Sequence, residues 1–345
     1  GLLGVFCGLC GANVRRTDAT IASQHGVNVA DIKNVLTVGN QVITEVERAV
    51  VGKRGLLEMM MASVLAGGHM LLEDFPGLGK TLIARSFAKA LGLDFKRIQF
   101  TPDLLPGDIT GGYIFNRVKN KFELRKGPLF ANIILADEIN RASPKTQSAL
   151  LEAMQEGQIT IEGETLRLPD PFLVLATQNP IEYEGTFPLP EAQLDRFMLK
   201  LTVGHPTFEE EKLILRRRRE RQQDEVELRE ITKAKQVLEL REAVESVHVD
   251  ADLESYIASL VHATRVDRRV SVGASPRASL AFLKMARANA ALASRDFIIP
   301  DDIKRYATPI LTHRVILQPE YWMSRSVSDD VIRDALEKTP VPVVK

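Results

Sequence analysis

The sequence DFPGLGKT, residues Asp74–Thr81, decides the fold of this chain. A short, mostly apolar run over 69–72 precedes it and a helical pattern over 81–91 follows it, so a strand enters and a helix leaves. Glycines let backbone N–H groups surround a phosphate, and the N-terminus of a helix adds a favourable dipole. We therefore predict a phosphate-binding loop with these contact residues: Pro76, Gly77, Leu78, Gly79, Lys80, Thr81 and Leu82.

Two side chains of this loop have predicted roles. Lys80 would reach the β- and γ-phosphates, and the Thr81 hydroxyl would ligate Mg²⁺. Asp74 stands where the common pattern G-x-x-x-x-G-K-[ST] has its first glycine, so the strict pattern fails at that position. The alternative is an unrelated glycine-rich turn, which the strand before the loop and the helix after it disfavour.

The rest of the chain predicts an α/β fold with a parallel five-stranded sheet, because strands alternate with helices. The expected strands are 69–72, 95–100, 131–136, 172–177 and 196–202, and the expected helices between or before them are 38–50, 56–66, 81–91 and 143–156. Two β-hairpin inserts interrupt the alternation, 112–115 with 121–125 and 158–161 with 165–168.

Beyond residues 203–206 the sequence predicts helices and no strands. We expect them at 207–223, 233–247, 250–264, 276–294, 300–311 and 326–338. The domain organisation follows: an unassigned tail over 1–35, an α/β nucleotide-binding domain over 36–205, and an all-α lid domain over 206–345.

A second chemical signal is the apolar strand that ends in Asp137-Glu138. Acidic residues at the carboxyl end of a buried strand point into the crevice where α/β sheets bind ligands. Asp137 would hold Mg²⁺, directly or through its water shell, and Glu138 would orient and deprotonate the attacking water. Alone, such a run is weak evidence for a nucleotide site, but it is strong evidence in a chain that already has a phosphate loop.

Three further polar residues complete the candidate site. Asn179 ends another strand and would fix the nucleophilic water or touch the γ-phosphate; the alternative is a turn residue before Pro180. Arg196 precedes the last strand, at a rim from which it could reach a neighbouring chain's nucleotide; the alternative is a surface ion pair with Asp195 or Glu191. The third is Arg277.

Arg277 lies in the first turn of a helix that Ser275 and Pro276 begin. A cation there opposes the helix dipole, which makes sense if an anion arrives, such as a γ-phosphate gripped from the helical domain. Such a grip would couple nucleotide state to the angle between the domains. A solvated arginine that tolerates the dipole is the equal alternative.

Composition excludes several classes of protein. The chain has 345 residues, of which 45% are hydrophobic and 26% charged, which is typical of a globular protein rather than a disordered one. Lys+Arg and Asp+Glu both number 45, so a protein that lives by coating nucleic acid is disfavoured. Cys7 and Cys10 cannot form a disulfide framework, and they are expected to be small tail residues rather than zinc ligands. No apolar stretch is long enough to span a membrane, and we expect a cytoplasmic protein.

The motifs in this order resemble those of the AAA+ ATPases, and the whole of 38–340 resembles the MoxR family within the clade that carries a helix-2 insert. The strings that carry the likeness are LLEDFPGLGKT (71–81), LADEINRA (135–142), KTQSALLEAM (145–154), ATQNP (176–180) and LPEAQLDRF (189–197). By this resemblance Lys80 and Thr81 are Walker A residues, Asp137 and Glu138 Walker B, Asn179 sensor 1, Arg196 the arginine finger and Arg277 sensor 2. Val51 and Gly52 would line the adenine pocket.

The resemblance implies hydrolysis of ATP with Mg²⁺ in a homo-oligomeric ring, expected to be a hexamer. It implies a chaperone that remodels or matures a protein complex, sometimes helping metal insertion, with a von Willebrand factor A domain protein as partner. The alternative function is a nucleic-acid motor on the same core. The basic side chains of the first hairpin suit either a substrate grip or a solvated loop tip. A nucleotide-binding scaffold without hydrolysis is a third alternative, which Glu138 argues against.

Overall fold

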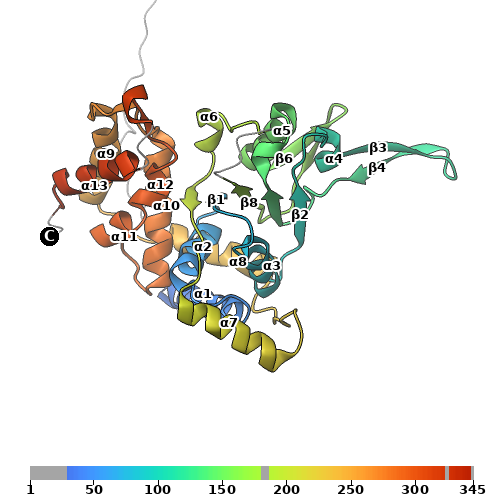
Figure 1. Cartoon of the computed structure of the whole chain (residues 1–345), viewed down its shortest axis with the longest axis horizontal. Coiled ribbons are helices and arrows are strands. Elements are labelled where there is room, and N and C mark those ends of the chain that lie inside the picture. Colours follow the sequence, from blue (N-terminus) through green and yellow to red (C-terminus); the bar gives the residue numbers. More distant parts are fainter. Residues whose placement is uncertain (1–28, 180–185, 323–325, 343–345) are drawn as a thin grey trace, which may run out of the picture.

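The computed structural model describes residues 29–179, 186–322 and 326–342 (Figure 1). Its first helix, α1 (Val29–Val46), begins well before the predicted start at residue 38, so residues 29–35 are not part of a tail. Ile32 and Val35 continue the apolar spacing of this helix and are fully buried, which explains the earlier start. Cys7 and Cys10 lie outside the described residues.

The centre of the molecule is the predicted parallel five-stranded sheet, in the order β2-β5-β8-β1-β9. Its strands are β1 (Met70–Glu73), β2 (Phe95–Gln99), β5 (Ile133–Asp137), β8 (Leu173–Gln178) and β9 (Leu199–Leu201). Every residue of β5 is buried, because helices cover both faces of the sheet. The carboxyl ends of β1, β5 and β8 therefore meet at one edge, where the candidate residues were expected.

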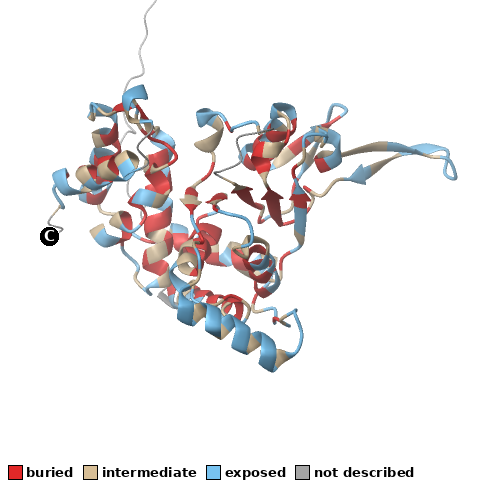
Figure 2. Cartoon of the chain, in the orientation of Figure 1, coloured by how far each residue is buried: buried red, intermediate tan, exposed pale blue. Residues whose placement is uncertain are grey.

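Alternate side chains of each strand enter different apolar clusters. Ile133 and Leu135 pack into the cluster with α1 and α3 (Lys80–Ala90), whereas Ile134 and Ala136 pack into the cluster with α5 (Pro144–Glu156). The remaining helices of this part of the chain are α2 (Arg54–Leu65), the short α4 (Pro106–Thr110), η1 (Ile139–Arg141), α5 (Pro144–Glu156) and the short α6 (Glu191–Leu194). Figure 2 shows the buried sheet between these layers.

Both predicted hairpins are present. The first pairs β3 (Gly111–Asn116) with β4 (Lys121–Lys126), and the second pairs β6 (Gln158–Ile161) with β7 (Glu164–Arg167). The β3–β4 hairpin projects from the body as a long arm (Figure 1). Gly111 and Gly127 allow the two strands to meet at its base, because a Cβ on Gly111 would lie 2.2 Å from the Arg125 carbonyl oxygen. We call this hairpin, residues 111–127, the arm.

The carboxyl-terminal part is helical, but the expectation that it contains no strands is wrong. β10 (Val270–Val272) and β11 (Ile316–Leu317) form a small antiparallel pair, too short to show a periodic pattern in the sequence. The helices are α7 (Phe208–Arg221), α8 (Ala234–Glu245), α9 (Ala251–Val266), α10 (Pro276–Leu292), α11 (Pro300–Lys304), α12 (Ala307–Leu311), η2 (Pro319–Tyr321) and α13 (Ser326–Lys338). The single helix expected over 300–311 is thus two.

The helical part shares its apolar core with the sheet-bearing part. Met285 and Phe282 of α10 belong to the same buried cluster as Val35 of α1 and Leu57 of α2. By contrast, α7 buries none of its residues and lies along the outside of the molecule (Figure 2). Among the described residues, no helix combines the length and apolarity that crossing a membrane requires.

Candidate functional site

The predicted phosphate loop connects β1 to α3. Gly77 and Gly79 have φ angles of 85° and 79°, a region that glycine enters freely, and α3 begins at Lys80. The loop backbone can therefore turn its N–H groups towards an anion at the start of α3. The ammonium of Lys80 donates to the carbonyl oxygens of Asp74 (2.6 Å) and Phe75 (3.0 Å). Partial burial lowers the pKa of Lys80, while the carboxylates of Asp74, Asp137 and Glu138 oppose that shift.

Asp74, the position that departs from the common pattern, has a structural role. Its Oδ2 accepts hydrogen bonds from the backbone N–H groups of Val203 (2.8 Å) and Gly204 (2.6 Å), and its Oδ1 accepts one from Phe75 (2.9 Å). The carboxylate is buried, so these charge-assisted bonds tie the start of the phosphate loop to the segment after β9. A glycine at this position could not make this connection.

Asp137 ends β5 at the same edge of the sheet. Its Oδ1 accepts a hydrogen bond from the Thr177 hydroxyl (2.6 Å). Its Oδ2 accepts two from Arg97 of β2, one from Nε (3.0 Å) and one from Nη2 (2.7 Å). The hydroxyl of Thr81 and the carboxylate of Asp137 are hard oxygen donors of the kind that Mg²⁺ prefers, so this donor set fits the expected ion.

Glu138 follows in a left-handed backbone conformation, φ 57°, which is strained for a residue with a side chain. The Thr177 hydroxyl accepts a hydrogen bond from the Glu138 N–H (2.8 Å) and so supports this conformation. The carboxylate accepts a hydrogen bond from Gln99 Nε2 (2.7 Å) and pairs with Arg141 Nε (3.2 Å). Both acidic side chains are thus held by neighbours that were not predicted from the sequence.

Arg141 is three residues from Glu138 in the same segment, whereas Arg97, Gln99 and Thr177 could have been found only from strand register. Gln99 of β2 stands opposite Asp137 of β5, and β5 in turn pairs with β8, which carries Thr177. Asn179 is half-buried directly after β8, whose last residue stands opposite Glu73 of β1. It therefore lies between the acidic strand end and the phosphate loop.

The segment expected to line the adenine pocket lies beside α7. Gly52 has a φ of 72°, a region that favours glycine, and a Cβ there would lie 1.9 Å from Glu210 Oε1, so a larger residue would displace this side chain. Lys53, next to the predicted Val51–Gly52 pair, donates to the His205 carbonyl oxygen (3.0 Å). The rings of His205 and Phe75 lie 6.2 Å apart, which brings this segment next to the phosphate loop.

Leu82 is exposed on α3 and lines a cavity of about 470 Å³. Ala49, Arg85 and residues 224–228 also line this cavity. The structure thus brings most of the predicted nucleotide contacts to one edge of the sheet, and it turns Leu82 towards a hollow between α3 and the segment after α7.

Arg196 and Arg277 lie together at the other edge of the sheet. Both line a cavity of about 320 Å³ with Gly67, Gly68 and His69, which precede β1, whereas the phosphate loop follows β1. The length of a four-residue strand, about 13 Å, therefore separates this cavity from the loop of the same chain. This placement does not support a grip of Arg277 on its own chain's γ-phosphate.

The surface ion pair considered for Arg196 is not formed with Asp195, whose carboxylate binds Arg314 and Ser275 instead. Within the described ranges, the Nε of Arg196 is buried and has no hydrogen-bond partner. Arg277 is exposed in the first turn of α10, where its N–H donates to the N-cap Ser275 hydroxyl (3.1 Å), as the sequence predicted for that cap.

Comparisons with known proteins agree with this geometry. A model of the AAA family, ATPases associated with various cellular activities, matches residues 69–199, and an AAA lid domain matches 262–335. The protein YeaC of Bacillus subtilis is 48% identical over 87% of this chain and 94% of its own length. Chaperone MoxR1 of Mycobacterium tuberculosis is 43% identical over 88% of this chain and 82% of its own.

A solved structure, a putative ATPase from Cytophaga hutchinsonii, is 42% identical and superposes with a TM-score of 0.85, covering 91% of this chain and 97% of that one. Sequence, fold and the arrangement of polar residues at the edge of the sheet therefore lead to one assignment. The chain belongs to the MoxR family of AAA+ ATPases.

Proposed function

We propose that this ATPase is a chaperone that uses ATP hydrolysis, at sites shared between chains, to remodel or mature a protein complex. The placement of the two arginines carries the proposal: Arg196 and Arg277 lie at the edge of the sheet opposite to Lys80. A complete site then needs a phosphate loop from one chain and arginines from its neighbour. The similarity to chaperone MoxR1 supports the chaperone role.

In this proposal, residues of one chain bind and activate the nucleotide. The loop from Pro76 to Thr81 surrounds the phosphates, Lys80 contacts the β- and γ-phosphates, and Val51 and Gly52 contact the base. Thr81 and Asp137 would hold Mg²⁺, which supplies charge neutralisation between the phosphates when bound. Glu138 orients the attacking water and takes its proton, and Asn179 fixes that water or the γ-phosphate.

Arg196 and Arg277 of the neighbouring chain would stabilise the charge that develops on the γ-phosphate. Both face one cavity in this chain, so one contact between chains delivers both cations. We propose a hexameric ring, a cytoplasmic location, and a von Willebrand factor A domain protein as partner, as the resemblance to the family implies.

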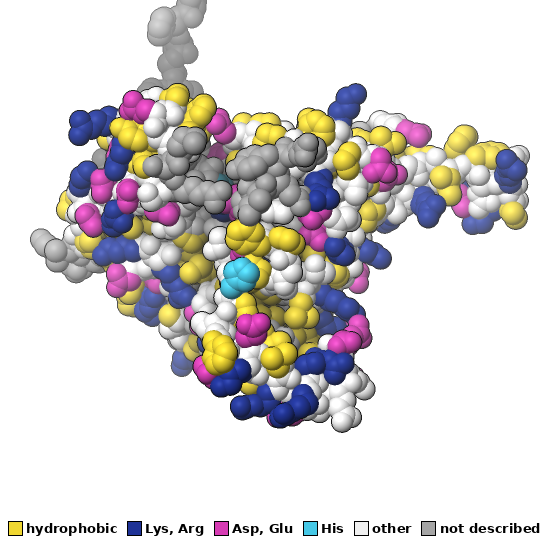
Figure 3. All heavy atoms as spheres, viewed as in Figure 1, with side chains coloured by type: hydrophobic (Ala, Val, Ile, Leu, Met, Phe, Trp, Pro, Cys, Tyr) yellow, Lys and Arg dark blue, Asp and Glu magenta, His cyan; other side chains and the backbone are white. Residues whose placement is uncertain are grey.

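We further propose that the arm contacts the client polypeptide. Its exposed apolar side chains include Phe115 and Phe122, whose rings lie 5.3 Å apart, and Val118, which is 96% exposed. Five of its side chains are cationic (Arg117, Lys119, Lys121, Arg125 and Lys126) and one, Glu123, is acidic. Figure 3 shows these yellow and dark blue side chains along the projecting arm. An unfolded segment with acidic and apolar residues is complementary to this surface.

The rate of ATP hydrolysis per chain, measured against protein concentration with light scattering in parallel, tests the shared site. We expect the rate to rise as oligomers form. Lys80→Ala should weaken nucleotide binding, whereas Glu138→Gln should bind ATP and fail to hydrolyse it. Arg196→Ala should be inactive alone and regain activity when mixed with Glu138→Gln, which still supplies arginines. A rate per chain that stays flat while the protein remains monomeric would refute the shared site.

A further inference from the structure

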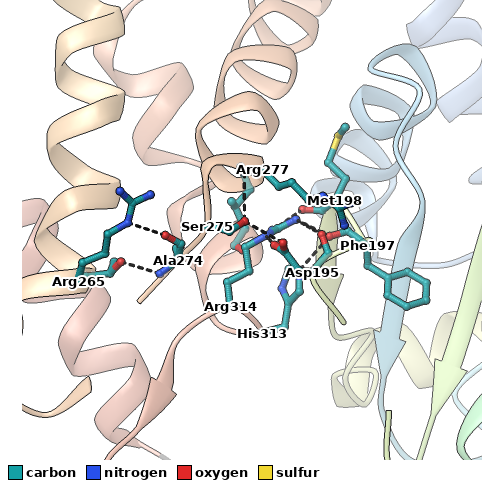
Figure 4. A network of polar contacts seen from close by, with 11 residues as sticks. Asp195, Phe197, Met198, Arg265, Ala274, Ser275, Arg277, His313 and Arg314 are labelled. Carbon is teal, nitrogen blue, oxygen red and sulfur yellow. Dashed lines mark hydrogen bonds and ion pairs between the residues drawn. The ribbon is translucent and has the colours of Figure 1, made fainter. Parts of the chain in front are cut away.

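Arg314 is a buried cation that connects the helical part to the strand end next to Arg196 (Figure 4). It lies in the turn after α12, and its Nε donates to Asp195 Oδ1 (2.8 Å). Its two terminal nitrogens donate to carbonyl oxygens on both sides of Arg196: Asp195 (3.2 Å), Phe197 (2.6 Å) and Met198 (3.2 Å). One guanidinium therefore fixes the backbone that carries Arg196.

The same Asp195 holds the segment that carries Arg277. Its Oδ2 accepts a hydrogen bond from the Ser275 hydroxyl (2.8 Å), and that hydroxyl also caps α10 by accepting from the Arg277 N–H. Both carboxylate oxygens of Asp195 thus accept hydrogen bonds, Oδ1 from Arg314 and Oδ2 from Ser275. Arg196 and Arg277 follow their anchor residues by one and two positions, so the anchors control where both arginines lie.

A second set of contacts fixes the α10 start from behind. Arg265 Nε donates to the Ala274 carbonyl oxygen (2.8 Å), as Figure 4 shows. The Thr264 hydroxyl accepts from the Ala274 N–H (3.0 Å). A Cβ on Gly273 would lie 2.6 Å from the Arg265 Cα, so the chain passes close against α9 at this glycine. The segment before Ser275 is therefore held on both sides.

The charged side chains that line the cavity beside this connection are mainly basic. Arg196, Arg277, Arg314 and Lys284 surround one cavity, and Asp195 is the acidic residue that lines it. Arg314 uses Asp195 as its partner, which leaves the cations of Arg196, Arg277 and Lys284 to face the cavity. A buried arginine is costly unless it is fully hydrogen-bonded, and apolar packing alone would not require one here.

We propose that Arg314, Asp195 and Ser275 form a clamp that holds Arg196 and Arg277 in one fixed arrangement, so that both enter the neighbouring chain's nucleotide site together. The clamp residues are positioning residues: they act through the two arginines. The proposal rests on the shared site proposed above and assigns the clamp to the arginine side of it.

Complementation between variants tests this assignment. Asp195→Asn, mixed in turn with Glu138→Gln and with Arg196→Ala, distinguishes the two sides of the site. We expect Asp195→Asn alone to lose about a hundredfold in rate, since a displacement of 1 Å has that effect. Glu138→Gln chains supply correctly placed arginines and should restore the rate, whereas Arg196→Ala chains supply none and should not. Lys80→Ala mixed with Arg196→Ala is the positive control, because each lacks a different side.

A milder pair of variants guards against a folding defect. Asp is as good an N-cap as Ser, so Ser275→Asp keeps the start of α10 while it repels Asp195. It should show the same complementation pattern, and Ser275→Thr, which keeps the hydroxyl, should retain most of the parent rate. Circular dichroism and urea unfolding check that each variant folds.

Two results would overturn the clamp while the shared site stands. In both, mixing with Glu138→Gln restores the rate of Arg196→Ala. The clamp is refuted if Asp195→Asn and Ser275→Asp keep the parent rate on their own. It is also refuted if mixing with Glu138→Gln does not restore the rate of these two variants. If Glu138→Gln fails to restore Arg196→Ala itself, the shared site is refuted and the clamp proposal falls with it.

Discussion

Arg97 donates two hydrogen bonds, from Nε and Nη2, to one carboxylate oxygen of Asp137, the residue proposed to hold Mg²⁺. A guanidinium and a divalent cation would then compete for the same carboxylate. Arg97 also donates to Gln99, which in turn binds Glu138, so one edge strand contacts both acidic residues. β2 leads through α4 into the arm, so the segment proposed to contact the client is continuous with this strand.

The first prediction concerns this competition. Arg97→Met removes the cation and keeps an apolar side chain of similar length. We expect the apparent affinity for Mg²⁺ to rise about tenfold, which corresponds to about 1.4 kcal/mol and is typical of one charge-assisted hydrogen bond. The measurement is binding of a fluorescent ATP analogue at increasing Mg²⁺ concentration, which needs no turnover. Lys96→Met, on the exposed neighbouring position of β2, is the control, and an unchanged Mg²⁺ dependence in Arg97→Met would contradict the prediction.

The second prediction concerns the departure from the common phosphate-loop pattern. Asp74→Gly restores the usual glycine but deprives three backbone N–H groups of a charged acceptor. We expect the free energy of unfolding in urea to fall by about 2–4 kcal/mol, and by less in Asp74→Asn, which keeps one acceptor oxygen. Asp94→Asn, in the turn before β2, should have little effect. Equal stability of Asp74→Gly and the parent would show that the tie to Val203 contributes nothing.

The third prediction is a loss of stability in acid. His69 is half-buried; its Nδ1 accepts from the Val174 N–H (3.0 Å), so its Nε2 is the donor to the Met154 carbonyl oxygen (2.9 Å). Burial lowers the pKa of His69 to about 4. The unfolded chain, with a histidine pKa near 6.5, then binds more protons, so stability is fully present above pH 6.5 and is lost as the pH falls towards 4.

From His69 alone, the free energy of unfolding should fall by about 2 kcal/mol between pH 7 and pH 5. Burial also lowers the pKa of His313, which adds to the effect in the same direction. Urea unfolding at both pH values should show a smaller decrease for His69→Gln than for the parent or for His262→Gln, whose histidine is exposed on α9. The same decrease in all three proteins would contradict this assignment.

The fourth prediction concerns the arm. Phe115→Ser with Phe122→Ser, and separately Lys119→Glu with Lys121→Glu, should each weaken binding of an acidic unfolded polypeptide by about tenfold or more. Fluorescence anisotropy of labelled, reduced and carboxymethylated α-lactalbumin measures this binding. Lys235→Glu, an exposed lysine of α8, controls for the change of charge. If the arm variants bind that polypeptide like the parent but lose steeply salt-dependent binding to a DNA oligonucleotide, the nucleic-acid motor is the better function.

The local parts of this site could be predicted from the sequence, and the non-local parts could not. The phosphate loop, with its two left-handed glycines, is one continuous segment, and its residue pattern alone predicts its conformation. The apolar runs that end in Asp137 and Gln178 identify their strands for the same reason. The contacts of Arg97, Gln99 and Thr177 depend on which strands are neighbours and in what register they pair. No single segment of the sequence contains that information.

The position of Arg277 shows the same limit at a larger scale. Its helix and its cap were predictable from Ser275 and Pro276, because capping is local. Its place beside Arg196 depends on how the helical part packs on the sheet, through Arg314 and the shared apolar core. The position of a residue on its helix can therefore be predicted correctly from the sequence while the partner that it faces cannot.

The phosphate loop and the two arginines lie at opposite ends of the strands, and this separation has a consequence for the number of complete sites in an assembly. In the proposed shared site, contacts between chains would run head to tail, so an open row of chains would leave one loop without arginines at one end and one unused pair of arginines at the other. Closing the row would remove both incomplete ends and add a working site without adding a chain. Under this proposal, small open complexes would have the lowest rate of hydrolysis per chain, and closure would raise that rate.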